Sequence, residues 1–360
     1  MPRLSPEGTL ELLLWCTVGM GILVCGLALF GALFQLRRDR LHRRRIQLHQ
    51  QWEPLVADLL FGSEVDLAPL ERLVGWEREL FRLFLMRTKE SLGGEEARRL
   101  DVFYRGLGLD GDLQARLHAR PPRQRALAAL EVDAFQVEER YPDLLLLLND
   151  PVPFVAHAAA RTLSRTQRLR FAEPVLQWVI AQDTYQQDRL LRLMESFGPL
   201  LPGWLEAYLA DVPDNPQAWR LFALMVASTR QAESEPRILA LLEYPDPEVQ
   251  AAALRALAAL GDPLAYDHVR PFAEAEAWVL RAQAARAMGI LGGPIAIPAL
   301  SDMMADPVFE VRRNAAHALH DLGRPGLAAL EAIVADFEGD RYARDLAMER
   351  LEWGEERGHP

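Results

Sequence analysis

Hydrophobic positions recur along the C-terminal half of the chain at a helical spacing. Counted from an anchor residue, apolar side chains return at +4, +7, +8 and +11, and a glycine follows at +12. At about 100° per residue these positions form one stripe of a helix, and glycine commonly ends such a helix. The clearest copies are Val249–Gly261, Leu280–Gly292 and Val311–Gly323. A helix that returns at this period predicts stacked repeats, because one unit cannot bury its apolar stripe alone.

Weaker copies extend the pattern toward the N-terminus. Asp150-Pro151 and Asp306-Pro307 each begin five residues before an anchor, where Asp suits the N-cap and Pro the first helical turn. A first, weaker unit covers Leu113–Leu130, and Pro121-Pro122 separates its two helices. The anchors lie at Val155, Gln186, Ala218, Val249, Leu280 and Val311. No stretch alternates with a period of two, so the sequence predicts an all-α chain.

A different pattern precedes the repeats. Leu12 to Phe34 contains no charged residue and is long enough, as a helix, to cross a bilayer. We therefore predict a single transmembrane helix at residues 10–36. Arginines follow it and predict, by the positive-inside bias, an extracytoplasmic N-terminus and a cytoplasmic C-terminal domain at the inner membrane. The arginines, which we also expect to contact anionic lipid, are Arg37, Arg38, Arg40, Arg43, Arg44 and Arg45.

Small residues share one side of this predicted helix. Their spacing allows close packing against another transmembrane helix, although small residues are common in such spans for other reasons. The residues are Thr17, Gly21, Cys25, Ala28 and Ala32.

These patterns predict six segments. They are a short extracytoplasmic N-terminus (1–9), a transmembrane helix (10–36), a basic juxtamembrane segment (37–50), a helical linker and N-terminal cap (51–112), the repeats (113–330), and a C-terminal cap helix with a tail (331–360).

The best unit, Asp306 to Gly323, resembles a HEAT repeat. The resemblance consists of Asp306, the Val311-Arg312 pair, the Ala315-Ala316 and Ala318-Leu319 pairs and a final Leu-Gly. It covers roughly residues 113–350 and implies a right-handed α-solenoid of HEAT-like repeats. HEAT proteins are mostly scaffolds and adaptors, so the resemblance implies a docking role without catalysis. The predicted arrangement, one membrane span followed by cytoplasmic HEAT repeats, is also similar to bacterial proteins found beside envelope polysaccharide glycosyltransferases.

The charge distribution argues against nucleic acid as a partner. The formal net charge is −11, with −1 on residues 1–36 and +5 on residues 37–45, which leaves −15 on the rest of the chain. An acidic body repels a phosphate backbone. The two cysteines, Cys16 and Cys25, lie in the apolar run, so no disulfide framework is predicted for the repeats.

Position +6 of the repeats carries a recurrent basic residue that the core does not need. This position lies opposite the apolar stripe and should face solvent. Stacked repeats would align these side chains along one face, where they would bind an acidic partner segment or an anionic ligand. The alternative is that each arginine pairs with a nearby acid, such as Asp188 or Glu195 for Arg192. The residues at +6 are Arg161, Arg192, Arg255, Arg286 and His317, and the unit anchored at Ala218 has Leu224 there instead.

No motif indicates catalysis, a cofactor or a metal. Gly106 to Gly111 matches the glycine pattern of a dinucleotide site but follows a helical stretch instead of a strand, so we interpret it as a loop. His317 and His320, with Asp321, supply too few ligands for a metal site. Nucleophile and phosphate-loop signatures are absent. We therefore expect a protein that is not an enzyme.

Our prediction is a membrane-tethered scaffold whose cytoplasmic solenoid docks a protein, with an integral membrane protein such as an envelope polysaccharide glycosyltransferase as the expected partner. The alternative is a ligand-binding HEAT protein, for example one similar to the lyases that attach bilin chromophores. A DNA glycosylase of the HEAT-like class is disfavoured by the acidic body.

Overall fold

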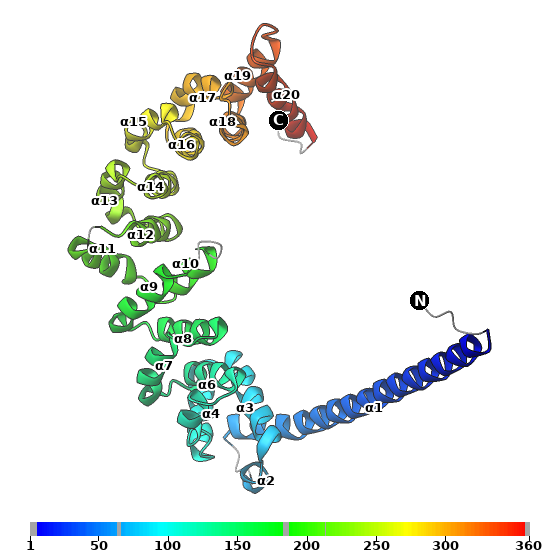
Figure 1. Ribbon diagram of the computed structural model, residues 1–360. Helices are drawn as coiled ribbons and strands as arrows, with labels where there is room; N and C mark the ends of the chain where they lie inside the picture. Colours follow the sequence, from blue (N-terminus) through cyan, green and yellow to red (C-terminus); the bar gives the residue numbers. More distant parts are fainter. Residues whose placement is uncertain (1–5, 63–65, 183–186, 213, 357–360) are drawn as a thin grey trace. The chain divides into compact units, whose positions relative to one another are not determined.

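The computed structural model describes residues 6–62, 66–182, 187–212 and 214–356, and it divides the chain into two units, Met1–Ala115 and Arg116–Pro360. In these described ranges every regular element is a helix (Figure 1), which confirms the predicted all-α class. The first unit contains α1 (Pro6–Leu60), α2 (Ala68–Glu71), α3 (Gly75–Glu90), α4 (Gly94–Gly106) and the start of α5 (Leu113–Leu117).

The first unit has a small aromatic core. Trp52 near the C-terminal end of α1 packs edge-on against Phe81 of α3, with ring centroids 5.0 Å apart, and Phe103 of α4 closes the cluster against Phe81. The guanidinium of Arg82 is buried beside this core and donates to the carbonyl of Leu109 at 3.1 Å and to Asp112 at 2.6 Å. These bonds fix the loop after α4, where Gly108 has a positive φ, so the loop interpretation of Gly106 to Gly111 is confirmed.

The predicted transmembrane helix is not supported. Across the described residues, no helix is both long and apolar enough to cross a membrane. The predicted segments 10–36 and 37–50 do not correspond to separate elements, because α1 runs unbroken from Pro6 to Leu60 and carries the arginine cluster within it. Trp15, Leu27 and Phe30 are exposed on this helix. The predicted position at the inner membrane stays a prediction.

The second unit is built from helix pairs joined by short loops. Its α-helices are α6 (Pro122–Phe135), α7 (Tyr141–Leu147), α8 (Pro153–Arg165), α9 (Ala172–Ile180), α10 (Gln187–Glu195), α11 (Leu201–Asp211), α12 (Pro216–Thr229), α13 (Glu235–Ala240), α14 (Pro247–Leu260), α15 (Tyr266–Val269), α16 (Trp278–Leu291), α17 (Ile297–Met303), α18 (Phe309–Asp321), α19 (Arg324–Ala335) and α20 (Arg341–Glu356). Short 3-10 helices adjoin them at η1 (Glu138–Arg140), η2 (Leu169–Phe171), η4 (Ala232–Ser234), η5 (Leu241–Glu243), η6 (Pro263–Ala265), η7 (Arg270–Glu274) and η8 (Gly293–Ala296).

The even-numbered helices α6 to α18 stack on one another in chain order, and we call them the anchor row. The odd-numbered helices α7 to α17 form a second row on the opposite side of the same unit, which we call the return row (Figure 1). Each return helix packs against the anchor helix of its own pair, as α11 does on α12 and α17 on α18. This arrangement is the solenoid that the repeat period predicted.

The apolar stripe forms the core between the rows. Anchors Val155, Ala218, Val249 and Val311 are fully buried, and Leu280 is nearly so. Positions +4 and +8 are also buried in every pair from α8 to α18, for example Phe222 and Val226 in α12. The left-handed backbone expected after the anchor helix is present at Gly198, Gly261 and Gly323. The 31-residue pattern therefore specifies which face of each helix is covered.

Candidate interaction surface

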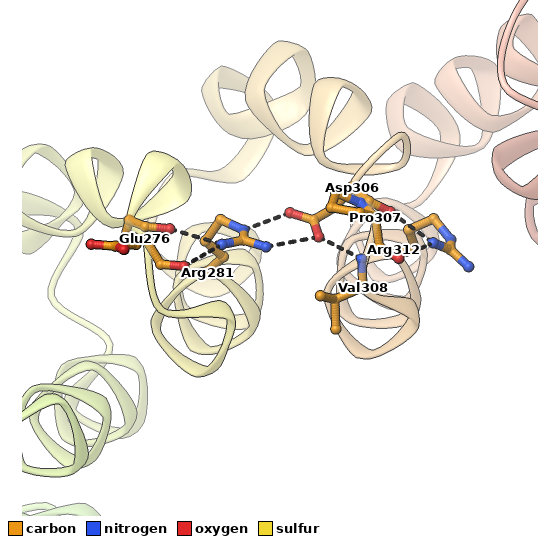
Figure 2. A network of polar contacts seen from close by, with 7 residues as sticks. Glu276, Arg281, Asp306, Pro307, Val308 and Arg312 are labelled. Atoms are coloured by element: carbon orange, nitrogen blue, oxygen red, sulfur yellow. Dashed lines mark hydrogen bonds and ion pairs between the residues drawn. The ribbon is translucent and has the colours of Figure 1, made fainter.

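Two sets of arginines on the anchor row have opposite surroundings. The first set consists of Arg281 and Arg312, each one residue after an anchor, and Arg125, which lies 31 residues before the corresponding position in α8. Arg125 and Arg281 connect neighbouring repeats. Arg281 of α16 donates from Nε and Nη2 to the two carboxylate oxygens of Asp306, at 2.6 and 3.1 Å. Its Nη1 donates to the carbonyls of Ala275 and Glu276, both at 2.9 Å, as Figure 2 shows for Glu276. One side chain thus joins its own loop to the next repeat.

The same contacts recur near the start of the second unit. Arg125 of α6 binds both oxygens of Asp150, at 2.7 and 2.9 Å, and its Nη1 binds the carbonyls of Ala119 and Arg120. Arg312 of α18 makes only the backbone contacts of this kind: its Nη1 donates to the carbonyls of Asp306 and Pro307 (Figure 2). We call the two complete contacts, Arg125–Asp150 and Arg281–Asp306, the Arg–Asp links.

Each linking aspartate also closes the turn before a helix. It is not the N-cap that the sequence predicted, because the N-caps of α8 and α18 are Val152 and Val308. Asp306 accepts from the backbone N–H of Val308 at 2.8 Å, and Asp150 from that of Val152 at 2.9 Å. The hydrogen bond from Arg125 lowers the pKa of Asp150. Burial acts to raise the pKa of Asp306, but the hydrogen bonds from Arg281 and Val308 outweigh it, and the net shift is downward. Both aspartates are therefore held as carboxylates within structural contacts.

The pattern of apolar positions did not predict these links, although the sequence contains a signal for them. The spacing of apolar residues predicts that Arg125 and Arg281 lie on helices, but it does not predict which carboxylate each of them binds. In both links the Arg precedes its Asp by the same spacing, 125 to 150 and 281 to 306. A repeated spacing of opposite charges at the repeat boundary indicates a contact between repeats.

The second set is the predicted one at position +6, and we call Arg161, Arg192, Arg255 and Arg286 the arginine ladder. The structure places one on each of α8, α10, α14 and α16, and all four are exposed. Anchor helices are covered by the return row and by their neighbours, so these side chains occupy the remaining face of the anchor row. In the part of the chain that the structure describes, none of the four forms an ion pair.

The alternative of local pairing is not seen between Arg192 and Glu195. Glu195 accepts a hydrogen bond from Ser228 Oγ of α12 instead of pairing with Arg192. The side chain of Asp188 lies outside the described residues.

The fifth predicted residue differs from the ladder arginines. His317 of α18 is exposed, but its Nε2 contacts Nη2 of Arg350 on α20. Burial, followed by the positive charge of Arg350, lowers the pKa of His317. His317 thus belongs to the contact between α18 and α20.

Two ladder arginines line one surface pocket. The pocket lies between α8 and α10, has a volume of about 600 Å³, and is bordered by His157, Arg161, Arg165, Gln167, Arg192, Leu193 and Ser196. Arg165 is ion-paired with Asp133 at 3.2 Å, whereas Arg161 and Arg192 add two positive charges to the wall. The structure therefore brings the first two rungs of the ladder to a common cavity and leaves Arg255 and Arg286 outside it.

The residues predicted for membrane contact all belong to α1. The side chains of Thr17, Gly21, Cys25, Ala28, Ala32 and Arg37 lie outside the described residues. Arg38, Arg40, Arg43, Arg44 and Arg45 are exposed on α1, and Arg44 pairs with Glu77 of α3 at 3.2 Å. Among the described residues, no three His, Cys, Asp or Glu side chains cluster closely enough to hold a metal. The predicted absence of a metal, a cofactor and an enzymatic activity stays a prediction.

The comparisons with known proteins give a family match over part of the chain and several similar solved structures. The HEAT-repeat family model matches residues 201–289 and 267–351. Among solved structures, the chain is similar to YibA of Escherichia coli, with 14% identity and a TM-score of 0.41, over 78% of this chain and 98% of that one. An engineered protein has 17% identity and a TM-score of 0.36, over 82% and 87% of the two chains.

A third similar structure is the complex of CpcE and CpcF of phycocyanin lyase from Nostoc sp. PCC7120, with 18% identity and a TM-score of 0.28, over 67% of this chain and 92% of that chain. The comparison with curated proteins found no match. The repeat pattern, the paired helices and the family match together show that residues 201–351 form HEAT repeats.

Proposed function

We propose that this protein is a non-catalytic scaffold that docks an acidic segment of a partner protein on the arginine ladder. The observation that carries the proposal is the regular placement of Arg161, Arg192, Arg255 and Arg286. They occupy the same repeat position, are exposed on the same row of helices and form no ion pair among the described residues.

The contrast with the Arg–Asp links supports a role outside the fold. Arg125 and Arg281 are both mostly buried and paired, so the fold accounts for them. The ladder arginines stabilise no described contact, and exposed arginine is well suited to bidentate recognition of carboxylates. An acidic segment that crosses several repeats would engage several rungs at once, and the regular repeat would set the spacing of its charges.

Charge reversal on the ladder tests this proposal. The double variant Arg255→Glu/Arg286→Glu should lose capture of the partner that co-purifies with the wild-type chain, because repulsion replaces two attractive contacts. The control is Arg270→Glu/Arg324→Glu, which makes the same change of charge on η7 and α19, at exposed arginines that form no ion pair among the described residues. Affinity purification with quantitative mass spectrometry compares the three chains.

Equal capture by the ladder variant and the wild-type chain would refute the docking role. Equal loss in the ladder variant and the control would also refute it, because the effect would then come from net charge and not from the ladder.

A further inference from the structure

The pocket between α8 and α10 differs from the rest of the ladder, because two ladder arginines border one open surface cavity there. Its volume of about 600 Å³ lies within the range of small-molecule sites. Two residues of the arginine ladder line it, Arg161 on α8 and Arg192 on α10. The buried side chain of Leu193 forms part of its lining, so the cavity is backed by the core between the repeats.

The charge of the pocket is opposite to that of the chain. The chain as a whole carries a net charge of −11, whereas three guanidinium groups line this cavity. The carboxylate of Asp133, which is 9% exposed, pairs with Arg165 and so neutralises one of them. Arg161 and Arg192 have no carboxylate partner among the described residues and present about two positive charges to the cavity.

Gln167 adds a neutral donor at an unusual backbone position. It follows α8 with a φ of 55°, in the left-handed region that glycine occupies most easily. The equivalent position is a glycine after α10, α14 and α18, namely Gly198, Gly261 and Gly323, whereas Gln136 after α6 and Arg230 after α12 share the left-handed φ of Gln167. The fold therefore accommodates glycine at this position, and the amide of Gln167 is held at a conformational cost beside the basic pocket.

We propose that this pocket binds a phosphomonoester. Such a group carries close to two negative charges and three acceptor oxygens, which balance two unpaired guanidinium groups better than a single carboxylate does. Arg161 and Arg192 take the phosphate oxygens, and Gln167 donates the neutral hydrogen bond. The cavity also has room for part of the molecule that carries the phosphate. This site does not require the docked protein of the proposed function.

Titration calorimetry of the full-length chain tests the proposal with three probes: O-phosphoserine, inorganic phosphate and glutarate. We expect O-phosphoserine to bind at least as tightly as inorganic phosphate and about tenfold or more tighter than glutarate, which offers only carboxylates. Arg161→Gln and Arg192→Gln should each weaken O-phosphoserine binding about tenfold or more, because each removes one charged fork. Arg255→Gln is the matched control and should bind normally, since it changes the same repeat position outside the pocket.

Gln167→Gly separates binding from folding. Glycine fits the left-handed backbone, so the melting temperature should stay the same or rise while O-phosphoserine binding weakens. The proposal is overturned by undetectable binding of O-phosphoserine, by equal affinity for glutarate, by tighter binding of inorganic phosphate, or by Arg192→Gln and Arg255→Gln behaving alike. Equal partner capture by Arg255→Glu/Arg286→Glu and the wild-type chain, with intact O-phosphoserine binding, would refute the docking proposal alone.

Discussion

The end repeats and the central repeats of the solenoid are held together by different contacts. At the ends, the Arg–Asp links join α6 to the start of α8 and α16 to the start of α18. In the centre, the residues one after the anchor are Ala156, Gln187, Trp219 and Gln250, and none carries the guanidinium that such a link needs. Gln250 donates instead to the carbonyl of Leu242, eight residues before it, at 2.9 Å.

Central repeats depend on weaker and more exposed connections. Asn215 and Asp246 cap α12 and α14, and the ion pair between Arg220 and Glu248 spans 3.1 Å with Glu248 more than half exposed. Exposed pairs of this kind contribute little to stability. The common apolar stripe therefore suffices to stack the repeats, and the Arg–Asp links add strength where the array meets its ends.

The largest expected effect comes from breaking a link. Asp306→Ala removes both carboxylate oxygens that Arg281 binds and the hydrogen bond from the N–H of Val308, and it leaves a mostly buried guanidinium without its carboxylate. We expect a loss of about 2–3 kcal/mol in the free energy of unfolding. Gln250→Ala, the matched change in a central repeat, should cost about 1 kcal/mol or less, because it removes one neutral hydrogen bond. Urea unfolding measures both values.

Hydrogen exchange would locate the effect of Asp306→Ala, with faster exchange expected first in α16 and α18. Equal losses for Asp306→Ala and Gln250→Ala would contradict the difference between end and central repeats.

Low pH should weaken the Arg–Asp links of the end repeats. The folded pKa values of Asp150 and Asp306 are lowered, so these carboxyls contribute stability above the usual pKa of an aspartate and lose that contribution as the pH falls through their folded values. Below about pH 4 we therefore expect a steeper fall of stability in the wild-type chain than in Asp306→Asn, whose amide does not titrate. Urea midpoints measured across the acid range test this. Parallel curves would show that the link does not contribute to acid sensitivity.

The smallest expected effect concerns a helix end in the centre. Arg230 caps α12 with a φ of 53°, whereas α14 ends at Gly261 with a φ of 76°. Arg230→Gly should raise the free energy of unfolding by about 0.5–1 kcal/mol, and Gly261→Ala should lower it by about 1 kcal/mol. Thermal unfolding of the two single variants checks whether one melting temperature rises and the other falls relative to the wild-type chain. A loss of stability in Arg230→Gly would mean that its side chain makes a contribution larger than the backbone strain.

Much of the repeat architecture could be predicted because it depends on local periodicity. Val249, Leu280 and Val311 are buried as their spacing required, and Arg255 and Arg286 are exposed because position +6 lies opposite the stripe. The predicted transmembrane helix rested on hydropathy alone, and the structure describes one helix from Pro6 to Leu60 without support for a span. Hydropathy registers an uncharged run but not where the helix that contains it begins and ends.

The sequence by itself determined the helical repeats, their buried faces and the solvent-facing arginines, because each follows from the angle between successive residues of a helix. Only the tertiary structure decided which charges meet. It joined Arg281 to Asp306, left Arg192 without Glu195, and brought Arg161 and Arg192 to one pocket. Those outcomes depend on distances between neighbouring helices and on the direction of side chains across them, which no local pattern specifies.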